Sequence, residues 1–231
     1  MSIKINYLNK NISKSASNLV LFSNEKFNIS AIKKHLSNLE FSYIYDLLKT
    51  SDLKKNMFVF EVNSKKKIIL ISIKKDLKEF DIENLGAEFF KRINYGKNSE
   101  YYINSDSLIS KQENFLGHFL HGLKLKSYEF KKYKTKKETR IISINILGTK
   151  NKTSTHNQLK FKALEEGIFY ARDLVSEPGN ILHPDEYAKR LSSLRKDGLK
   201  VNVYDEKKLK KLGMNALLGV GMGSIRGSYL V

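Results

Sequence analysis

The sequence of 231 residues contains no cysteine and no tryptophan. Without cysteine the chain can form no disulfide bond, thiolate metal site or cysteine nucleophile. No apolar run reaches about 18 residues, so the sequence predicts no transmembrane helix. The N-terminus, Met1–Leu8, alternates polar and apolar residues and has no continuous apolar segment of the kind that a secretory signal needs. These absences predict a cytoplasmic protein that does not associate with membranes.

Acidic residues are few, with 24 Asp and Glu against 42 Lys and Arg, which gives a net charge of +18. Residues 1–150 hold 28 of the basic residues and 15 of the acidic ones, a net charge of +13. Such a surface could bind nucleic acid through phosphate contacts. However, only 6 of the 42 basic residues are arginine, and the lysines are spread along the chain. Biased composition is therefore the favoured interpretation, and the densest cluster, Lys131–Lys137, is predicted to be a solvated connection between a helix and a strand.

Proline is also scarce, because only Pro178 and Pro184 occur. The first 150 residues alternate between strand-like and helix-like patterns, which predicts a layered α/β domain with a mixed sheet flanked by helices. The nearly continuous apolar run Ile68–Ile73 suits a central strand that is covered on both faces. The strand candidates are Lys4–Leu8, Asn18–Phe22, Met57–Val62, Lys67–Ile73, Tyr101–Ile103 and Arg140–Leu147.

Apolar residues spaced three and four apart predict three helices. Their apolar positions are Ile82, Leu85, Phe89 and Ile93 in the first, Phe115, Phe119 and Leu123 in the second, and Phe161, Leu164, Ile168, Ala171 and Val175 in the third. The third helix should end near Glu177, because Pro178 cannot continue it. It is expected to link two domains, with the first at residues 1–150, the linker helix at 151–177 and the second domain at 178–231.

The second domain is expected to begin another α/β sheet. A helix from Pro184 to about Lys196, a strand at Lys200–Tyr204, a short helix capped by Asp205 and a strand at Ala216–Val220 are predicted. The chain then ends on Tyr229–Val231, an apolar segment after a glycine-rich turn. These features predict an incomplete, truncated domain in which Leu217, Leu218, Val220 and Tyr229–Val231 are exposed or poorly packed.

Few side chains suggest chemistry. The run Gly219–Ser224 lacks the glycine spacing of a dinucleotide-binding loop, so a tight turn after a strand is favoured over a phosphate site. His118 and His121 lie one helical turn apart near Glu113, yet their segment is mostly apolar and a structural role is favoured over a metal site. Arg172, Asp173 and Glu177 are assigned to capping and packing between domains. His35, His156 and His183 are taken as isolated, and no catalytic, cofactor-binding or metal-binding residue is assigned.

Four segments, in the same order along the chain, resemble the leucyl (cytosol) aminopeptidases. They are Gly117-x4-Gly122-Leu123-x4-Tyr128-x-Phe130-x2-Tyr133-Lys134-Thr135-Lys136, then Ala171-Arg172-Asp173-Leu174-Val175-x-Glu177-Pro178-x-Asn180-x3-Pro184, then Leu199-Lys200-Val201 through Asp205, and finally Leu212-Gly213-Met214-x-Ala216-Leu217-Leu218-Gly219-Val220-Gly221-x-Gly223-Ser224. The second segment is the strongest match. Met222 departs from the family, which commonly has glutamine at that position.

The resemblance implies an N-terminal α/β domain joined by a long helix to a catalytic domain with two divalent metals, Mn or Zn. In the family these metals activate a water that attacks the peptide carbonyl, and the proteins form hexamers. The metal ligands lie in motifs of the Gly-Lys-Gly-x-x-Phe-Asp type, which this sequence lacks.

The sequence is therefore interpreted as the N-terminal portion of a two-metal exopeptidase that acts on peptides, inactive by itself and assembled as a homo-oligomer. Two alternatives stay open: a binding or assembly module that contacts nucleic acid or subunits through the basic first domain, and a nucleotide-binding domain.

Overall fold

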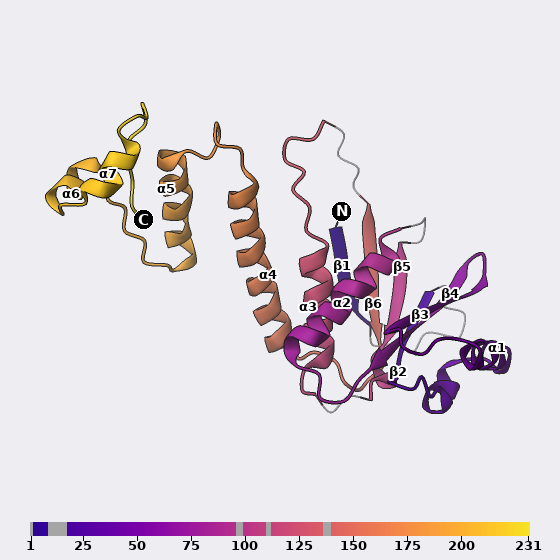
Figure 1. Cartoon of the computed structure of the whole chain (residues 1–231). Coiled ribbons are helices and arrows are strands. Elements are labelled where there is room, and N and C mark those ends of the chain that lie inside the picture. The colour runs from indigo at the N-terminus through magenta and orange to yellow at the C-terminus, as the bar shows by residue number, and fades with distance from the viewer. Residues whose placement is uncertain (1, 9–17, 96–98, 110–111, 136–139) are drawn as a thin grey trace. The chain divides into compact units, whose positions relative to one another are not determined.

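A computed structural model of the chain describes residues 2–8, 18–95, 99–109, 112–135 and 140–231. The chain forms two compact units, Met1–Gly167 and Ile168–Val231. In Figure 1 the first unit runs in colour from indigo to orange and the second from orange to yellow. The boundary falls within α4 (Thr155–Ser176), the predicted linker helix, which ends one residue before Glu177.

The first unit is built on a six-stranded sheet in the order β1-β6-β5-β2-β4-β3. Every pair of neighbours is parallel except β3 and β4, which form an antiparallel hairpin. The strands are β1 (Ser2–Tyr7), β2 (Asn18–Asn24), β3 (Met57–Asn63), β4 (Lys66–Ile73), β5 (Glu100–Asn104) and β6 (Ile141–Leu147). All six lie where the sequence predicts strands, and the layered α/β fold with a mixed sheet is confirmed.

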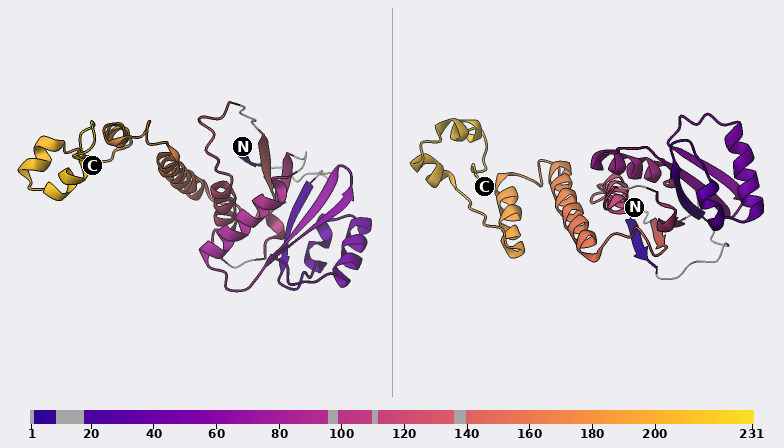
Figure 2. Two further views of the ribbon diagram at one scale, coloured as in Figure 1. Left: turned by 45° about the horizontal axis from the view of Figure 1, so that its top comes forward. Right: turned by 90° about the horizontal axis from the view of Figure 1, so that it is seen from below.

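Helices cover both faces of this sheet (Figures 1 and 2). On one face, α2 (Glu79–Ile93) and α3 (Phe115–Lys126) pack on Val20 and Phe22 of β2. On the other face, the 3-10 helix η1 (Ser30–His35) and α1 (Asn38–Lys49) pack on Leu19 and Leu21. In β4, successive side chains likewise point to opposite faces of the sheet, and residues Ile68–Ile71 are all buried. Because helices cover both faces of the sheet, the central strands are continuous apolar runs in the sequence and do not alternate between polar and apolar residues.

The helices α2 and α3 of the first unit pack closely against each other, and two glycines permit this packing. A Cβ at Gly86 would meet the backbone carbonyl of Phe119, and a Cβ at Gly122 would meet that of Glu83. Because these obstacles are backbone atoms, no side-chain movement could relieve either clash. The glycines therefore set the distance between the helices that cover this face.

The helix α1 was missed by the sequence interpretation, although its start carries a recognisable signal. The Ser37 side chain accepts a hydrogen bond from Glu40 N–H (3.3 Å), and the Glu40 carboxylate accepts one from Ser37 N–H (2.9 Å). This reciprocal pair is a capping box, which satisfies two backbone donors at a helix N-terminus. The spacing Ser37-x-x-Glu40 could have predicted the helix.

The second unit contains α5 (Pro184–Ser193), the 3-10 helix η3 (Leu194–Asp197), α6 (Glu206–Lys211) and α7 (Asn215–Gly221). Pro184 is the first residue of α5, and Gly198 (φ 87°) and Gly213 (φ 70°) end helices in the left-handed conformation that glycine favours. The Asp205 side chain accepts a hydrogen bond from Lys208 N–H and caps α6. The predicted helix boundaries of this unit are thus confirmed.

The two strands predicted in the second unit are wrong. Ala216–Val220 lies within α7, whose Ala and Leu residues favour helix when no sheet offers a partner. In Lys200–Tyr204 only Tyr204 pairs, in an isolated antiparallel bridge with Leu230. The backbone hydrogen bonds of this bridge are 2.8 and 3.0 Å long. A strand pattern is realised only where neighbouring strands complete the hydrogen-bonding ladder, and the described part of this unit supplies none.

Apolar side chains remain exposed at the end of the second unit. Val220 is 87% exposed, and Tyr229, Leu230 and Val231 are exposed as well, as the sequence predicts. Leu217 and Leu218 are half-buried. Among the described residues, no helix is long and apolar enough to cross a membrane.

Candidate functional site

His118 and His121, the histidines weighed as a metal pair, serve instead as contacts between helices of the first unit. His118 Nδ1 lies 3.1 Å from a carboxylate oxygen of Glu83 on α2, whereas His121 Nδ1 lies 3.3 Å from Glu165 on α4. The Phe161 ring of α4 packs against both imidazoles at centroid distances of 5.0 and 5.1 Å. The two histidines are thus directed to different carboxylates, and the structural interpretation is the one that the geometry supports.

No group of three or more His, Asp or Glu side chains in the described part of the chain could hold a metal ion. The two divalent metals that the resemblance implies therefore have no fitting set of ligands among these residues, since such a pair needs several converging carboxylates.

An ion-pair cluster of the second unit includes Glu177, which belongs to the segment with the strongest family resemblance. Arg190 of α5 donates a hydrogen bond to Glu177 (2.9 Å) and another to Glu186 (3.0 Å). The Glu177 side chain is only 1% exposed. The hydrogen bonds to Glu177 and Glu186 raise the pKa of Arg190, and the hydrogen bond from Arg190 lowers the pKa of Glu186. The cluster ties the residue after α4 to α5 and so fixes the Pro178–His183 turn between them.

A second polar cluster of this unit joins His183, Asp185 and Arg226. His183 Nδ1 contacts the Asp185 carboxylate, and an Arg226 NH group lies 3.2 Å from each of these two side chains. Desolvation raises the pKa of Asp185, but the hydrogen bond from His183 and the charge of Arg226 outweigh it, so the pKa lies below its usual value. The interpretation of His183 as isolated is therefore wrong. His35 is not isolated either, because its Nδ1 lies 2.9 Å from the Asn104 amide nitrogen.

The glycine-rich run Gly219–Ser224 was predicted to follow a strand. Instead, it includes the end of the helix α7. A Cβ at Gly221 would meet the hydroxyl of Ser228, so this glycine allows the chain to turn back closely. Ser228 N–H then donates to the Glu206 carboxylate on α6 (3.1 Å). The run thus permits a tight return of the chain.

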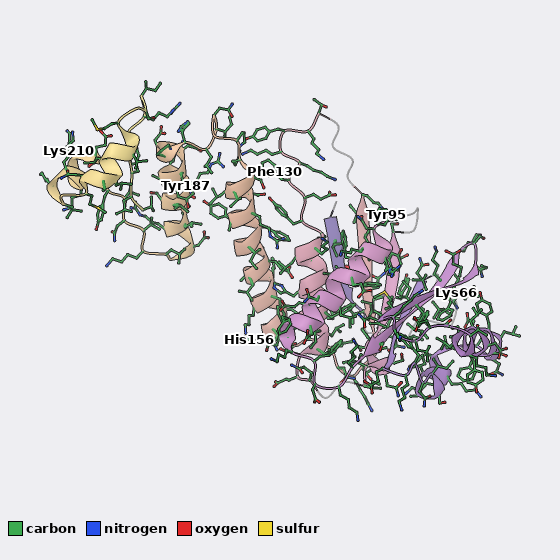
Figure 3. All side chains as sticks on the ribbon, in the orientation of Figure 1. Lys66, Tyr95, Phe130, His156, Tyr187 and Lys210 are labelled. Carbon is green, nitrogen blue, oxygen red and sulfur yellow. The ribbon has the colours of Figure 1, made fainter. Side chains whose placement is uncertain are left out.

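Lysines are distributed over both units; Lys66 of the first and Lys210 of the second are labelled in Figure 3. In the predicted cluster at 131–137, Lys131 pairs with Glu129 and Lys132 lies over the Tyr133 ring. This segment lies between α3 and β6, as expected, although Lys136 and Lys137 are outside the described residues.

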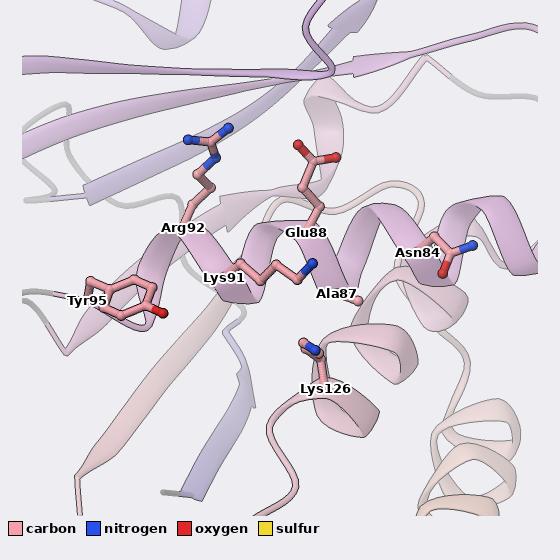
Figure 4. A pocket seen from close by; sticks show the side chains of 7 residues that line it. All are labelled: Asn84, Ala87, Glu88, Lys91, Arg92, Tyr95 and Lys126. Atoms are coloured by element: carbon pink, nitrogen blue, oxygen red, sulfur yellow. The ribbon is translucent and has the colours of Figure 1, made fainter.

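A basic pocket, called here the α2–α3 pocket, gathers further cations on the first unit. It has a volume of about 840 Å³ and is lined by Asn84, Ala87, Glu88, Lys91, Arg92, Tyr95 and Lys126. Figure 4 shows Lys91 on α2, Tyr95 just after the end of that helix, and Lys126 at the end of α3.

Comparisons with known proteins place these features in context. The sequence model of the cytosol aminopeptidase family, catalytic domain, matches residues 169–231. A probable cytosol aminopeptidase of Bradyrhizobium sp. is 42% identical over 114 residues, which cover 48% of this chain and 23% of the relative. One of Nitrobacter winogradskyi is 32% identical over 177 residues, 71% of this chain and 34% of the relative. The chain thus spans about a quarter to a third of the curated relatives that it matches.

Solved structures agree in fold. A tomato leucine aminopeptidase mutant superposes with a TM-score of 0.76 at 18% identity, covering 99% of this chain and 50% of the tomato one. The bottromycin maturation enzyme BotP in complex with Mn gives a TM-score of 0.67 at 15% identity, over 93% of this chain and 44% of BotP. These identities are too low to carry activity, and the likeness is one of fold.

Proposed function

This chain is a relative of the leucyl (cytosol) aminopeptidases, and on that premise we propose that it forms the N-terminal portion of a peptidase that removes N-terminal residues from peptides. The observation that carries the proposal is the match of residues 169–231 to the family's catalytic domain. Within that stretch, Glu177 and Arg190 form the buried ion pair that joins α4 to α5. The residues of the family resemblance thus have a defined structural task at the start of the catalytic domain.

We propose that three segments of the chain have different structural roles. Residues 1–150 would form the N-terminal domain, 151–177 the linker helix and 178–231 the first part of the catalytic domain. The two metals, Mn or Zn in the family, would be held by residues that this sequence lacks, because the Gly-Lys-Gly-x-x-Phe-Asp motif is absent from it. The residues of this chain would instead hold the turns around α5 in place, through the Arg190 cluster and the His183–Asp185–Arg226 cluster.

The catalytic part of the proposal is tested with the chain itself. Residues 1–231, supplied with Mn²⁺ or Zn²⁺, should release no leucine from leucinamide, because the metal ligands would lie elsewhere. Metal-dependent turnover by this chain alone, abolished by a chelator, would overturn the assignment of the ligands to other sequence.

We also propose the family's cytoplasmic location and homo-oligomeric, hexameric assembly for the protein that contains this chain. A native mass spectrum of that protein should show six copies. A monomer at micromolar concentration would contradict the proposed assembly without touching the proposed activity.

A second candidate function is nucleic-acid binding by the first unit, which the α2–α3 pocket favours through Lys91, Arg92 and Lys126. If the charge is compositional instead, affinity for duplex DNA should be weak and should collapse between low and physiological salt. A fluorescence anisotropy titration at two salt concentrations measures this. Sequence-selective binding at physiological salt would promote the second candidate over compositional bias.

A further inference from the structure

The chain leaves the central strand β2 in a direction opposite to that of both its neighbours. After β2, the chain passes through Phe27 and Ile29, which belong to the core beneath α1. After β4, it passes through Leu77, which packs against the core beneath α2 and α3. After β5, it passes through Leu108, which is part of that same core. All three strands are parallel, so these diverging segments begin at one edge of the sheet.

Such a divergence is a topological switch point, and in open α/β sheets it opens a crevice outside the carboxyl ends of the strands in which ligands bind. The structure has a pocket at that place, called here the switch-point crevice. Its volume is about 550 Å³, within the range of small-molecule sites, and it is lined by Asn24, Ile73, Lys74, Lys75, Asp76, Leu77, Ile109 and Gln112. Every wall therefore comes from one of the three diverging segments.

The lining of the switch-point crevice has a basic part and an apolar part. Lys74 and Lys75 are adjacent, exposed cations that follow β4 directly. Ile73, Leu77 and Ile109 supply apolar surface, and Ile109 is 48% exposed. Asn24 and Gln112 add carboxamides, and the Asn24 oxygen accepts a hydrogen bond from Asn28 N–H (2.9 Å), which fixes this side chain in the wall.

We propose that the switch-point crevice binds a small organic phosphate, with the phosphate beside Lys74 and Lys75 and the organic body against Ile73, Leu77 and Ile109. A phosphate monoester carries up to two negative charges, which matches two lysines better than a single carboxylate does. Asp76, which follows this pair in the sequence, also lines the crevice and favours a ligand whose organic part offers hydrogen-bond donors such as hydroxyl or amino groups.

The proposal is tested by titrating the 231-residue chain, labelled with ¹⁵N, with AMP, glucose 6-phosphate, inorganic phosphate and adenosine. At least one of the two organic phosphates should shift the backbone amides of residues 24, 73–77, 109 and 112. Inorganic phosphate and adenosine should each bind more weakly, because each engages only one part of the crevice.

Two double variants sharpen the test, and both change exposed lysines, so both should fold. Lys74→Ala with Lys75→Ala should weaken organic phosphate binding by about tenfold or more. Lys210→Ala with Lys211→Ala removes the same charge from another pair of adjacent, exposed lysines, in the second unit, and should leave the affinity within about twofold of the unchanged chain.

The proposal fails if neither organic phosphate shifts the crevice amides, or if the two double variants weaken binding equally. It also fails if inorganic phosphate binds as tightly as the organic phosphates, since the apolar wall would then contribute nothing. Because the readout is binding within the first unit, each of these outcomes leaves the proposed peptidase function untouched.

Discussion

Among individual residues, Glu40 is the most instructive, because it is a charged residue in the core-facing stripe of α1. It is 9% exposed, and its carboxylate lies 2.5 Å from the Lys66 ammonium, whose side chain is 12% exposed. Burial raises the pKa of Glu40, but hydrogen bonds from Lys66 and from Ser37 outweigh burial and bring the pKa below its usual value. The folded state thus holds this carboxylate in its charged form.

Replacing Glu40 with Gln should remove the ion pair and retain the capping box, since glutamine also serves at that position. At pH 7 the free energy of unfolding should fall by about 1–2 kcal/mol. A group with a lowered pKa in the folded state stabilises above its unfolded pKa and loses this effect as the pH falls through the folded pKa. The difference between Glu40→Gln and the unchanged chain should therefore shrink below about pH 4.

Denaturant unfolding followed by circular dichroism at pH 7 and pH 3 measures this difference. Asp46→Asn is the matched control, because Asp46 forms an exposed pair with Lys49 on the same helix and should cost less than about 0.5 kcal/mol. If Glu40→Gln lowered the free energy of unfolding by the same amount at both pH values, the charge of Glu40 would not be the cause.

Arg190 offers a second test at this scale. Arg190→Gln removes the cation beside the buried Glu177 and should destabilise α5, because the carboxylate would be left without its ion-pair partner. The backbone amides of α5 should then exchange with deuterium faster, and hydrogen-exchange mass spectrometry measures this rate. The neighbouring Lys189 is 82% exposed and 3.9 Å from Glu186, so Lys189→Gln should leave exchange unchanged. Equal acceleration by both variants would argue against the buried pair.

Among the elements, the sequence predicted those whose apolar residues face a complete core. The strands β2 and β4 are covered on both faces, and α2 and α3 bury one stripe each, so their periodicity is plain. In α1 the pattern is inverted in part: Glu40 is buried, whereas Leu39 and Tyr43 are 86% and 44% exposed. That mixture hides the helical period, and only the capping box marks the element.

The second unit shows the opposite error, since Ala216–Val220 was predicted to be a strand and forms helix. Composition cannot reveal whether a neighbouring strand is present. The polar clusters were equally hard to foresee, because Arg226 meets Asp185 from 41 residues away along the chain. The Glu177–Arg190 contact spans 13 residues and was not predicted, because the sequence assigned Glu177 only to capping and packing between domains.

The close packing of α2 on α3 gives a prediction at the scale of elements. Gly86→Ala or Gly122→Ala should destabilise the first unit by about 1–3 kcal/mol, because the added methyl meets backbone atoms that cannot move aside. This cost exceeds the gain of up to about 1 kcal/mol that alanine brings to a helix interior. Thermal unfolding by circular dichroism measures the change.

Gly167→Ala is the control, since a Cβ there would meet nothing within 4 Å. It lies in the exposed part of α4 and should stabilise the chain by about 0.5–1 kcal/mol. If all three variants changed stability in the same direction, helix propensity rather than helix spacing would explain the glycines.

At the scale of the whole molecule, the first unit has a core on both faces of its sheet, whereas residues 169–231 match the catalytic-domain model of the cytosol aminopeptidase family. The exposed apolar residues Val220, Met222 and Ile225 are 87%, 84% and 103% exposed. Exposed apolar surface of this kind marks contacts with other protein. In the proposed function, that contact is with the remaining catalytic sequence of the peptidase.

The most direct test of the central claim is to supply the catalytic sequence of a relative. A chimera would join residues 1–231 to the part of the Bradyrhizobium relative that follows its matched region, and leucine release from leucinamide would be measured with Mn²⁺. The account predicts metal-dependent release by the chimera, lost on adding a chelator, and none by the Bradyrhizobium segment alone. A folded chimera that releases no leucine would contradict the claim that this chain supplies the N-terminal portion of an aminopeptidase.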